Sequence, residues 1–211
     1  MKLRKYNFFK GLVLATTLIW LSMGVANSAS ASGEDPYQKM EYITTQLLDI
    51  IGDHQQDFPK NEDSYFRALG VLLDTAVDFK NISRLVMGPY AKKATPDQRK
   101  LFLEKFRMEL VKTYGRPLIS FGNEKIILVD RKPLQDGQRR LIVKQEIRGD
   151  GDVFPLQYSM ARKKTGEWMI LNVIVDGINL RKTFRGQFTQ AAQKSGGDLD
   201  TVISQWASEV D

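Results

Sequence analysis

The chain contains no cysteine among its 211 residues. Without a thiol it can form no disulfide, carry no cysteine nucleophile and accept no lipid on an N-terminal cysteine. One histidine, His54, leaves almost nothing for histidine-based metal sites or for Ser-His-Asp chemistry. No P-loop type of glycine-rich phosphate loop is present. We therefore expect no enzyme, no metal site and no cofactor, in a fold held together by packing alone.

The first 31 residues contain no acidic side chain. Four lysines and arginines lie within residues 2–10, residues 11–26 are an apolar run, and residues 29–31 fit a small-x-small cleavage pattern. This order predicts a secretory signal peptide, residues 1–31, that is cleaved before Ser32. The alternative is a membrane anchor, although the apolar run is shorter than the ~20 residues of a membrane-spanning helix.

The remaining residues, 32–211, suit one domain with its own core. The net charge of the chain is +6, and four of its 31 basic residues belong to the predicted leader, which leaves 27 basic and 25 acidic residues. Nucleic-acid-binding domains usually carry a strong basic excess, so we expect no nucleic acid as a partner. Export through a cleaved leader predicts a soluble protein of the exported compartment, and we expect it to be a monomer.

The first half of the exported part has the spacing of helices. Asp35 and Pro36 begin one helix, a second runs over residues 63–77, and a short third is broken at Gly88 and Pro89. A longer helix follows. Thr95 is its cap, with Pro96 at its first position and Gln98 three residues after the cap. We expect it to end at Gly115 and Pro117.

The second half changes to the alternation of strands. Residues 126–129, 141–147, 154–160 and 168–175 are apolar at every second position or throughout, and short turns join them. Two further helices follow, one with Phe184 and Phe188 and one capped by Asp198. The sequence thus predicts an α+β fold with a four-stranded antiparallel meander packed against several helices.

Apolar side chains are abundant on the inward faces of these elements. Periodicity cannot distinguish a filled core from a ligand cavity, because both require the same pattern, so both interpretations stay open. If a cavity exists, its candidate lipid-binding residues are Phe79, Leu85, Val86, Tyr90, Phe106, Tyr114, Val143, Ile147, Phe154, Leu156, Tyr158, Met160, Leu171, Val173, Val175, Ile178 and Phe188.

Basic residues occur in short clusters along the chain. Most such clusters are solvated surface, but one at a cavity mouth can attract a phosphate group, and others can mark docking faces for acidic partners. The candidates for headgroup contact or docking are Arg162, Lys163, Lys164 and Arg185.

Two long segments, with a third between them, resemble a known family. GPYAKKATPDQRKLFLEKFRMELVKTY (residues 88–114) and GEWMILNVIVDGINLRKTFRGQF (residues 166–188) are similar to a helix and to the last strand, turn and helix of the toluene-tolerance, or MlaC-like, family. FPLQYSM (residues 154–160) is similar to its preceding strand. Leu171, Asn172 and Asn179 differ from the family pattern, where we expect Tyr, Asp and Ser, while Arg185 matches it.

The resemblance implies a fold like the nuclear-transport-factor-2 (NTF2-like) cone, with an apolar cavity between sheet and helices. It implies a periplasmic phospholipid carrier that holds acyl chains and needs no catalytic residue. The implied partners are an outer-membrane lipoprotein-porin complex and an inner-membrane ABC transporter with an MCE-domain subunit, and the implied role is maintenance of lipid asymmetry.

Two other functions compete with a carrier. A small-molecule enzyme on a similar cone needs a carboxylate or phenol with a shifted pKa in the cavity, and Asp176 and Tyr158 are the candidates. A ligand-free protein that bridges envelope components needs no cavity at all.

Overall fold

The computed structural model describes residues 34–121, 124–149 and 151–206. The predicted signal peptide and its cleavage site lie outside the described residues. Within the described ranges, no helix is both long enough and apolar enough to cross a membrane.

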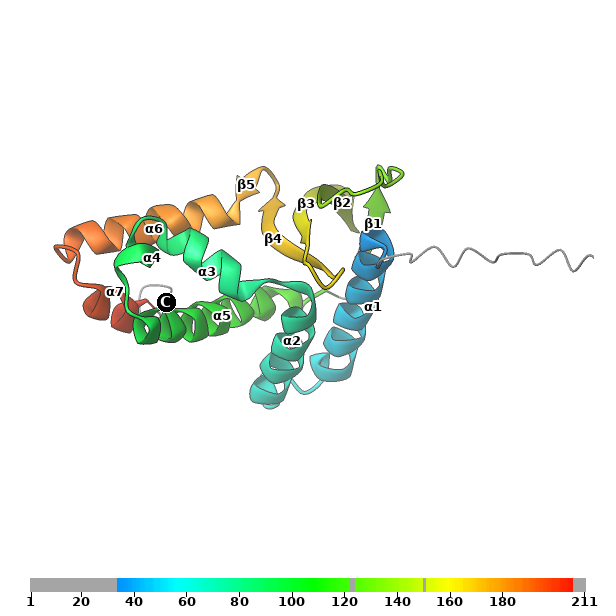
Figure 1. Cartoon of the computed structure of the whole chain (residues 1–211). Helices are drawn as coiled ribbons and strands as arrows, with labels where there is room; N and C mark the ends of the chain where they lie inside the picture. The colour runs from blue at the N-terminus through cyan, green and yellow to red at the C-terminus, as the bar shows by residue number, and fades with distance from the viewer. Residues whose placement is uncertain (1–33, 122–123, 150, 207–211) are drawn as a thin grey trace, which may run out of the picture. The chain divides into compact units, whose positions relative to one another are not determined.

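Helices precede and follow one sheet along the chain (Figure 1). The sheet contains β1 to β5 in sequence order, with every neighbouring pair antiparallel. The α+β class and the antiparallel meander are therefore confirmed. The elements are α1 (Pro36–Gln55), α2 (Glu62–Ala76), α3 (Phe79–Met87), α4 (Tyr90–Lys93), α5 (Pro96–Leu118), β1 (Lys125–Val129), β2 (Arg140–Gly149), β3 (Asp152–Arg162), β4 (Trp168–Val175), β5 (Ile178–Asn179), α6 (Leu180–Lys194) and α7 (Leu199–Gln205).

Capping side chains begin the helices where the sequence predicted. The Thr95 hydroxyl accepts from the Gln98 N–H at 3.1 Å, and the Gln98 side chain accepts from the Thr95 N–H at 3.0 Å. Asp35 and Asp198 accept from N–H groups of the first turns of α1 and α7. Each cap satisfies donors that have no partner inside the helix, which fixes the residue at which the helix begins.

The prediction of four strands was wrong by one, because β5 adds a fifth. Asp176 and Gly177 both have positive φ, at 47° and 79°, as a tight two-residue hairpin turn requires. The chain then pairs with β4 for only two residues before Asn179 caps α6. A strand of two residues shows no alternation, so the sequence pattern could not reveal it.

The expected end of the long helix was also wrong, because α5 continues through Gly115 and Pro117 to Leu118. Gly115 is buried against α2, where an ideal Cβ would lie 2.6 Å from Leu69 Cδ2. The Tyr65 hydroxyl donates to the Gly115 carbonyl at 2.8 Å. Gly115 thus permits a close approach of two helices, and Pro117 is the residue before the last residue of α5, so it costs the helix only one N–H donor near its end.

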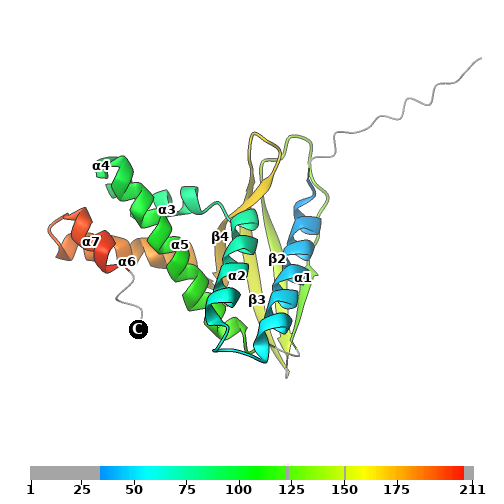
Figure 2. The ribbon, with the colours of Figure 1, turned by 90° about the horizontal axis from the view of Figure 1, so that it is seen from below.

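Helices α1 and α2 lie across one face of the sheet, and α3 to α7 gather beyond β4 (Figure 2). The buried side chains form three clusters. One joins the sheet to α1 and α2, a second joins α1, α2 and α5, and a third joins α3, α5, α6 and α7. In the described chain, no buried cluster joins α5 directly to the sheet. Most domains of this size have one contiguous core, so this division is the feature that bears on the site.

The close approach at Gly115 yields a test by substitution. Gly115→Ala should lower the free energy of unfolding by about 1–3 kcal/mol, because the added methyl group meets Leu69 and Phe66. Gly186→Ala is the matched control in α6, where a Cβ meets nothing within 4 Å and should add about 0.5–1 kcal/mol through helix propensity. Urea unfolding of both variants checks the opposite signs, and equal effects would contradict the packing described here.

Candidate functional site

One face of the sheet carries a continuous band of apolar side chains. Strand pairing places Val143 opposite Tyr158 and Tyr158 opposite Val173, and it places Leu156 opposite Val175. Since neighbours across strands share a face, the band crosses four strands. We call it the apolar strip, and it consists of Val143, Ile147, Phe154, Leu156, Tyr158, Val173, Val175 and Ile178.

Burial along the apolar strip changes from one end to the other. Val143 is fully buried beneath α1 and α2, Tyr158 and Val173 pack partly against the same cluster, and Phe154 and Ile178 are 46% and 59% exposed. The exposed end lies beside the β2–β3 and β4–β5 turns. A graded apolar surface that is closed at one end and open at the other is the form that a tail-binding site requires.

The open half of the strip has uneven cover in the described chain. Ile147, Phe154, Leu156 and Val175 belong to none of the three buried clusters, although Leu156 is only 7% exposed. The helices α1 and α2 therefore cover only part of the inner face. What remains is apolar surface that hydrocarbon would stabilise more than water.

Tyr158 lies at the transition between the two halves. Burial raises the pKa of its phenol above the ordinary value, yet its side chain keeps some accessible surface. Its hydroxyl makes no hydrogen bond within the described residues. A phenol that lies deep among protein atoms and is still accessible can hydrogen-bond to a molecule that reaches the strip.

The strip contains one polar interruption, at Gln145 on β2. This side chain is buried, and its amide nitrogen donates to the Thr44 hydroxyl of α1 at 2.8 Å. The hydrogen bond allows a polar side chain under α1 without an unpaired donor. It also fixes where α1 crosses the sheet, and so where the covered part of the strip ends.

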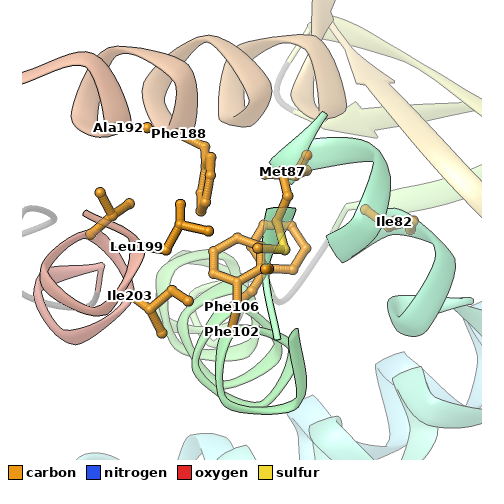
Figure 3. Close-up of a cluster of buried hydrophobic side chains, with 11 residues drawn as sticks. Ile82, Met87, Phe102, Phe106, Phe188, Ala192, Leu199 and Ile203 are labelled. Atoms are coloured by element: carbon orange, nitrogen blue, oxygen red, sulfur yellow. The ribbon is translucent and has the colours of Figure 1, made fainter. Parts of the chain in front are cut away.

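Several predicted residues from the helices lie in a different place. Phe106 and Phe188 are fully buried in the cluster of α3, α5, α6 and α7 (Figure 3). Val86 is buried in the same cluster, and Tyr90 packs at its edge. The rings of Phe102 and Phe188 are 4.8 Å apart. These side chains fill a helical core, and the structure does not bring them to the apolar strip.

Tyr114 stands at the margin of that helical core and is partly exposed. Its ring lies 6.3 Å from the ring of Phe184, which in turn lies 5.4 Å from Phe106. Phe184 was not among the predicted lipid-binding residues, although its spacing of four residues from Phe188 indicates that both lie on one face of α6. Burial raises the pKa of the Tyr114 phenol, as it does for Tyr158.

The other predicted apolar residues are distributed over three places. Met160 is buried with Val143 under α1 and α2, and Phe79 is buried with the Arg107 guanidinium 5.9 Å from its ring. Leu171 follows an irregularity in the β3–β4 pairing, and it lines a separate groove together with Leu85. The apolar strip therefore contains only part of the set of lipid-binding residues predicted from the sequence.

The register of β1 resolves which of its residues share the face of the strip. Ile126 lies opposite Ile147, and Leu128 lies opposite Gln145. Both are half-buried and face the helices, so they extend the apolar surface at its β1 edge. The sequence left this choice open because residues 126–129 are apolar throughout.

The predicted basic residues do not gather at the exposed end of the strip. Arg162 donates to the Gly166 carbonyl at 3.0 Å, and Lys163 pairs with Glu167 at 3.9 Å in the β3–β4 turn. Lys164 lies in the same turn, which is at the opposite end of β3 from Phe154. Arg185 lies on α6 beside Gly88, where an ideal Cβ would be 3.1 Å from its Nε.

Two departures from the family pattern have local roles. Asn172 is buried, and its side-chain oxygen accepts from the Arg181 N–H at 3.2 Å. Asn179 caps α6 by accepting from the Lys182 N–H at 3.0 Å. Both hold the beginning of α6 against β4.

Asp176, the carboxylate considered for catalysis, is exposed in the β4–β5 turn. Within the described ranges, no three His, Asp or Glu side chains come together as a metal site.

The raised pKa of Tyr158 predicts a pH dependence of stability. The unfolded chain ionises this tyrosine near its ordinary pKa of about 10, whereas the folded chain keeps the proton to higher pH. The free energy of unfolding should therefore fall as pH rises above about 10. Tyr65, whose pKa burial raises to about 12, acts in the same direction.

Chemical unfolding at a series of pH values tests this dependence. Tyr158→Phe should lessen the fall in stability above pH 10 and leave the profile below about pH 9 parallel to that of the parent, because both states of the tyrosine are then protonated. An unchanged slope in the variant would mean that Tyr158 ionises in the folded chain as freely as in the unfolded one.

Comparisons with known proteins give one consistent result. Residues 41–208 match the family described as "MlaC protein". The toluene tolerance protein ttg2D of Pseudomonas putida is 36% identical over 182 residues, which cover 86% of this chain and 84% of that protein. The intermembrane phospholipid transport system binding protein MlaC of Haemophilus influenzae is 25% identical over 174 residues, or 80% of this chain and 79% of that protein.

A solved structure is similar in fold. It is a phospholipid-binding protein from Ralstonia solanacearum in complex with a phospholipid, with a TM-score of 0.68 and 22% identity. The match covers 82% of this chain and 99% of the other. At this identity the likeness establishes a shared architecture.

Proposed function

Because the chain belongs to the MlaC protein family, we propose that it binds phospholipid and carries it between membranes without chemical change. The observation on which this rests is the apolar strip, which is buried at Val143 and open at Phe154 and Ile178. The phospholipid named with the Ralstonia protein, whose fold is similar, supports the same ligand. The acyl chains lie along the strip, and the headgroup stays in water at its exposed end.

The physics of transfer explains why such a surface is needed. Exposing two tails of about 16 carbons each would cost roughly 25 kcal/mol, at about 0.8 kcal/mol per CH₂. Free lipid therefore does not cross an aqueous space at a useful rate. A carrier must offer hydrocarbon contact similar to that of a bilayer, and it must leave the phosphate hydrated, because burial of an unpaired charge is costly.

The features of the strip match these requirements. Phe154 and Ile178 are exposed at its open end, so tails can reach the strip there without displacing buried side chains. Exchange with a membrane is then close to neutral, and contact with a partner can shift it in either direction. The Gln145 amide is buried and bonded to Thr44, whereas the Tyr158 hydroxyl has no such partner in the described chain and can donate to a lipid ester oxygen.

The setting of this transfer is part of the proposal. The protein is a periplasmic monomer exported by its leader, and it exchanges phospholipid with an outer-membrane lipoprotein-porin complex and an inner-membrane ABC transporter that carries an MCE domain. The transport system named for the Haemophilus relative supports this setting. Such a carrier maintains the lipid asymmetry of the envelope, and it needs neither a cofactor nor a catalytic residue.

Native mass spectrometry of the purified full-length protein tests the ligand. We expect a species heavier than the polypeptide by the mass of one or more phospholipids, and organic extraction should recover the same lipids. A ligand-free spectrum, with no uptake from phospholipid vesicles, would instead favour a protein that only bridges envelope components.

A pair of substitutions tests the position of the tails. Val175→Glu places a carboxylate on the strip, so co-purified phospholipid should fall about tenfold or more, since an unpaired charge beside hydrocarbon is strongly unfavourable. Val153→Glu makes the same change on the opposite face of the same end of the sheet, where Val153 is 53% exposed. It should leave the lipid content unchanged.

Circular dichroism and thermal unfolding provide the control for folding in both variants. Equal lipid loss in the two folded variants would assign the tails to another surface, and full loading of the Val175 variant would remove the strip from the site.

A further inference from the structure

Positive charge is segregated on one part of the molecule. Residues 79–96 and 177–197 contain no acidic residue, and together they hold eight lysines and arginines. They form α3, α4 and α6, with α3 and α6 lying side by side (Figures 1 and 2). The eight residues are Lys80, Arg84, Lys92, Lys93, Arg181, Lys182, Arg185 and Lys194, and we call their surface the basic face.

The charges of the basic face are not neutralised by ion pairs. In the described chain none of the eight takes part in a salt bridge, and all except the half-buried Arg181 are exposed. The one acidic residue next to these segments at α3, Asp78, caps that helix by accepting from the Asn81 N–H. The face is therefore a free positive surface.

The helices α1 and α2 have the opposite charge. Residues 34–76 hold nine acidic and three basic side chains. In both views of the ribbon, α1 and α2 lie on the other side of β4 from α3, α4 and α6 (Figures 1 and 2). Although the net charge of the exported part is small, its positive and negative charges lie on different helices. The electric field of a charged surface would therefore orient the molecule.

Apolar side chains lie exposed within the basic face. A groove of about 610 Å³ is lined by Leu85 of α3, Ile142 of β2 and Leu171 of β4, with Arg140 and Arg181 also in its lining. Leu85 and Ile142 are exposed, Ile142 by 52%. Arginines beside exposed aliphatic side chains suit the interface of a membrane, where headgroups meet hydrocarbon.

From these observations we propose that the basic face binds directly to the surface of an anionic phospholipid bilayer. Seven exposed cations outside salt bridges of the described chain lie on three helices, together with the half-buried Arg181, which donates to the Leu171 carbonyl. Such a spread of charge responds to a density of negative charge rather than to one geometry of partner groups, and this favours a lipid surface over an acidic protein. The acidic helices α1 and α2 then point away from the bilayer. The inference goes beyond lipid carriage, because it assigns a membrane contact that needs no protein partner.

Vesicle co-sedimentation of the exported protein, purified without the predicted leader of residues 1–31, tests this contact. We expect binding to phosphatidylcholine vesicles with about 30% phosphatidylglycerol, weak binding to pure phosphatidylcholine, and loss of binding between about 50 and 300 mM salt. Lys80→Glu, Arg84→Glu and Lys182→Glu together should weaken binding at least about tenfold. All three side chains are exposed and outside salt bridges of the described chain, so the fold should persist.

The matched control reverses the same charge elsewhere. Lys60, Lys112 and Lys125 are exposed lysines outside the basic face, and their triple change to Glu should alter binding by less than about twofold. Co-purified phospholipid, measured separately, should be unchanged in both triple variants, so a failure of carriage and a failure of membrane contact can be distinguished. Equal loss in the two variants would overturn the proposal. Equal binding of the parent protein to both vesicle types would also overturn it. So would a result in which the parent binds no vesicles but still transfers lipid to a protein partner, with this transfer lost in the Lys80, Arg84 and Lys182 triple variant.

Discussion

Burial of hydrocarbon along the inner face of the sheet is the interaction on which the other features depend. Helices α1 and α2 cover that face around Val143 and Met160, and the Thr44–Gln145 hydrogen bond fixes the position of α1. Beyond Tyr158 no buried cluster of the described chain continues the cover. The fold therefore leaves the apolar side chains of Phe154 and Ile178 exposed to water, which costs stability.

The separate helical cluster makes this arrangement stable. Phe102, Phe106 and Phe188 pack with α7 into a core that does not need the sheet. Close contact between α2 and α5 at Gly115 supplies a further anchor. These two regions are packed independently of the exposed end of the strip.

Much of the fold could be predicted because local chemistry determines it. The caps at Asp35, Thr95 and Asp198 and the alternation in three strands identify elements from a few neighbouring residues. The errors arose where tertiary contacts override local signals. Gly115 predicts the end of a helix from its residue type, but in the structure it lies inside α5 and contacts α2. Strand β5 has two residues, which is too short to show the alternation of apolar and polar residues.

The site was predictable only in part, for a related reason. Alternation correctly groups Val143, Tyr158 and Val173 on one face, since the period of a strand is fixed by its backbone. It cannot say which helix covers that face. Phe106 and Phe188 have the same apolar character, yet they lie in another cluster. The irregularity at Ser159 and Met160 also separates Leu171 from its expected neighbours.

The two-residue strand β5 has a mechanical consequence. Ile178, at the exposed end of the strip, is separated from the first residue of α6 only by Asn179, which caps that helix. The hairpin turn at Asp176 and Gly177 leaves no slack in the chain at this point. The position of Ile178 on the strip therefore depends on the orientation of α6, because only Asn179 lies between them.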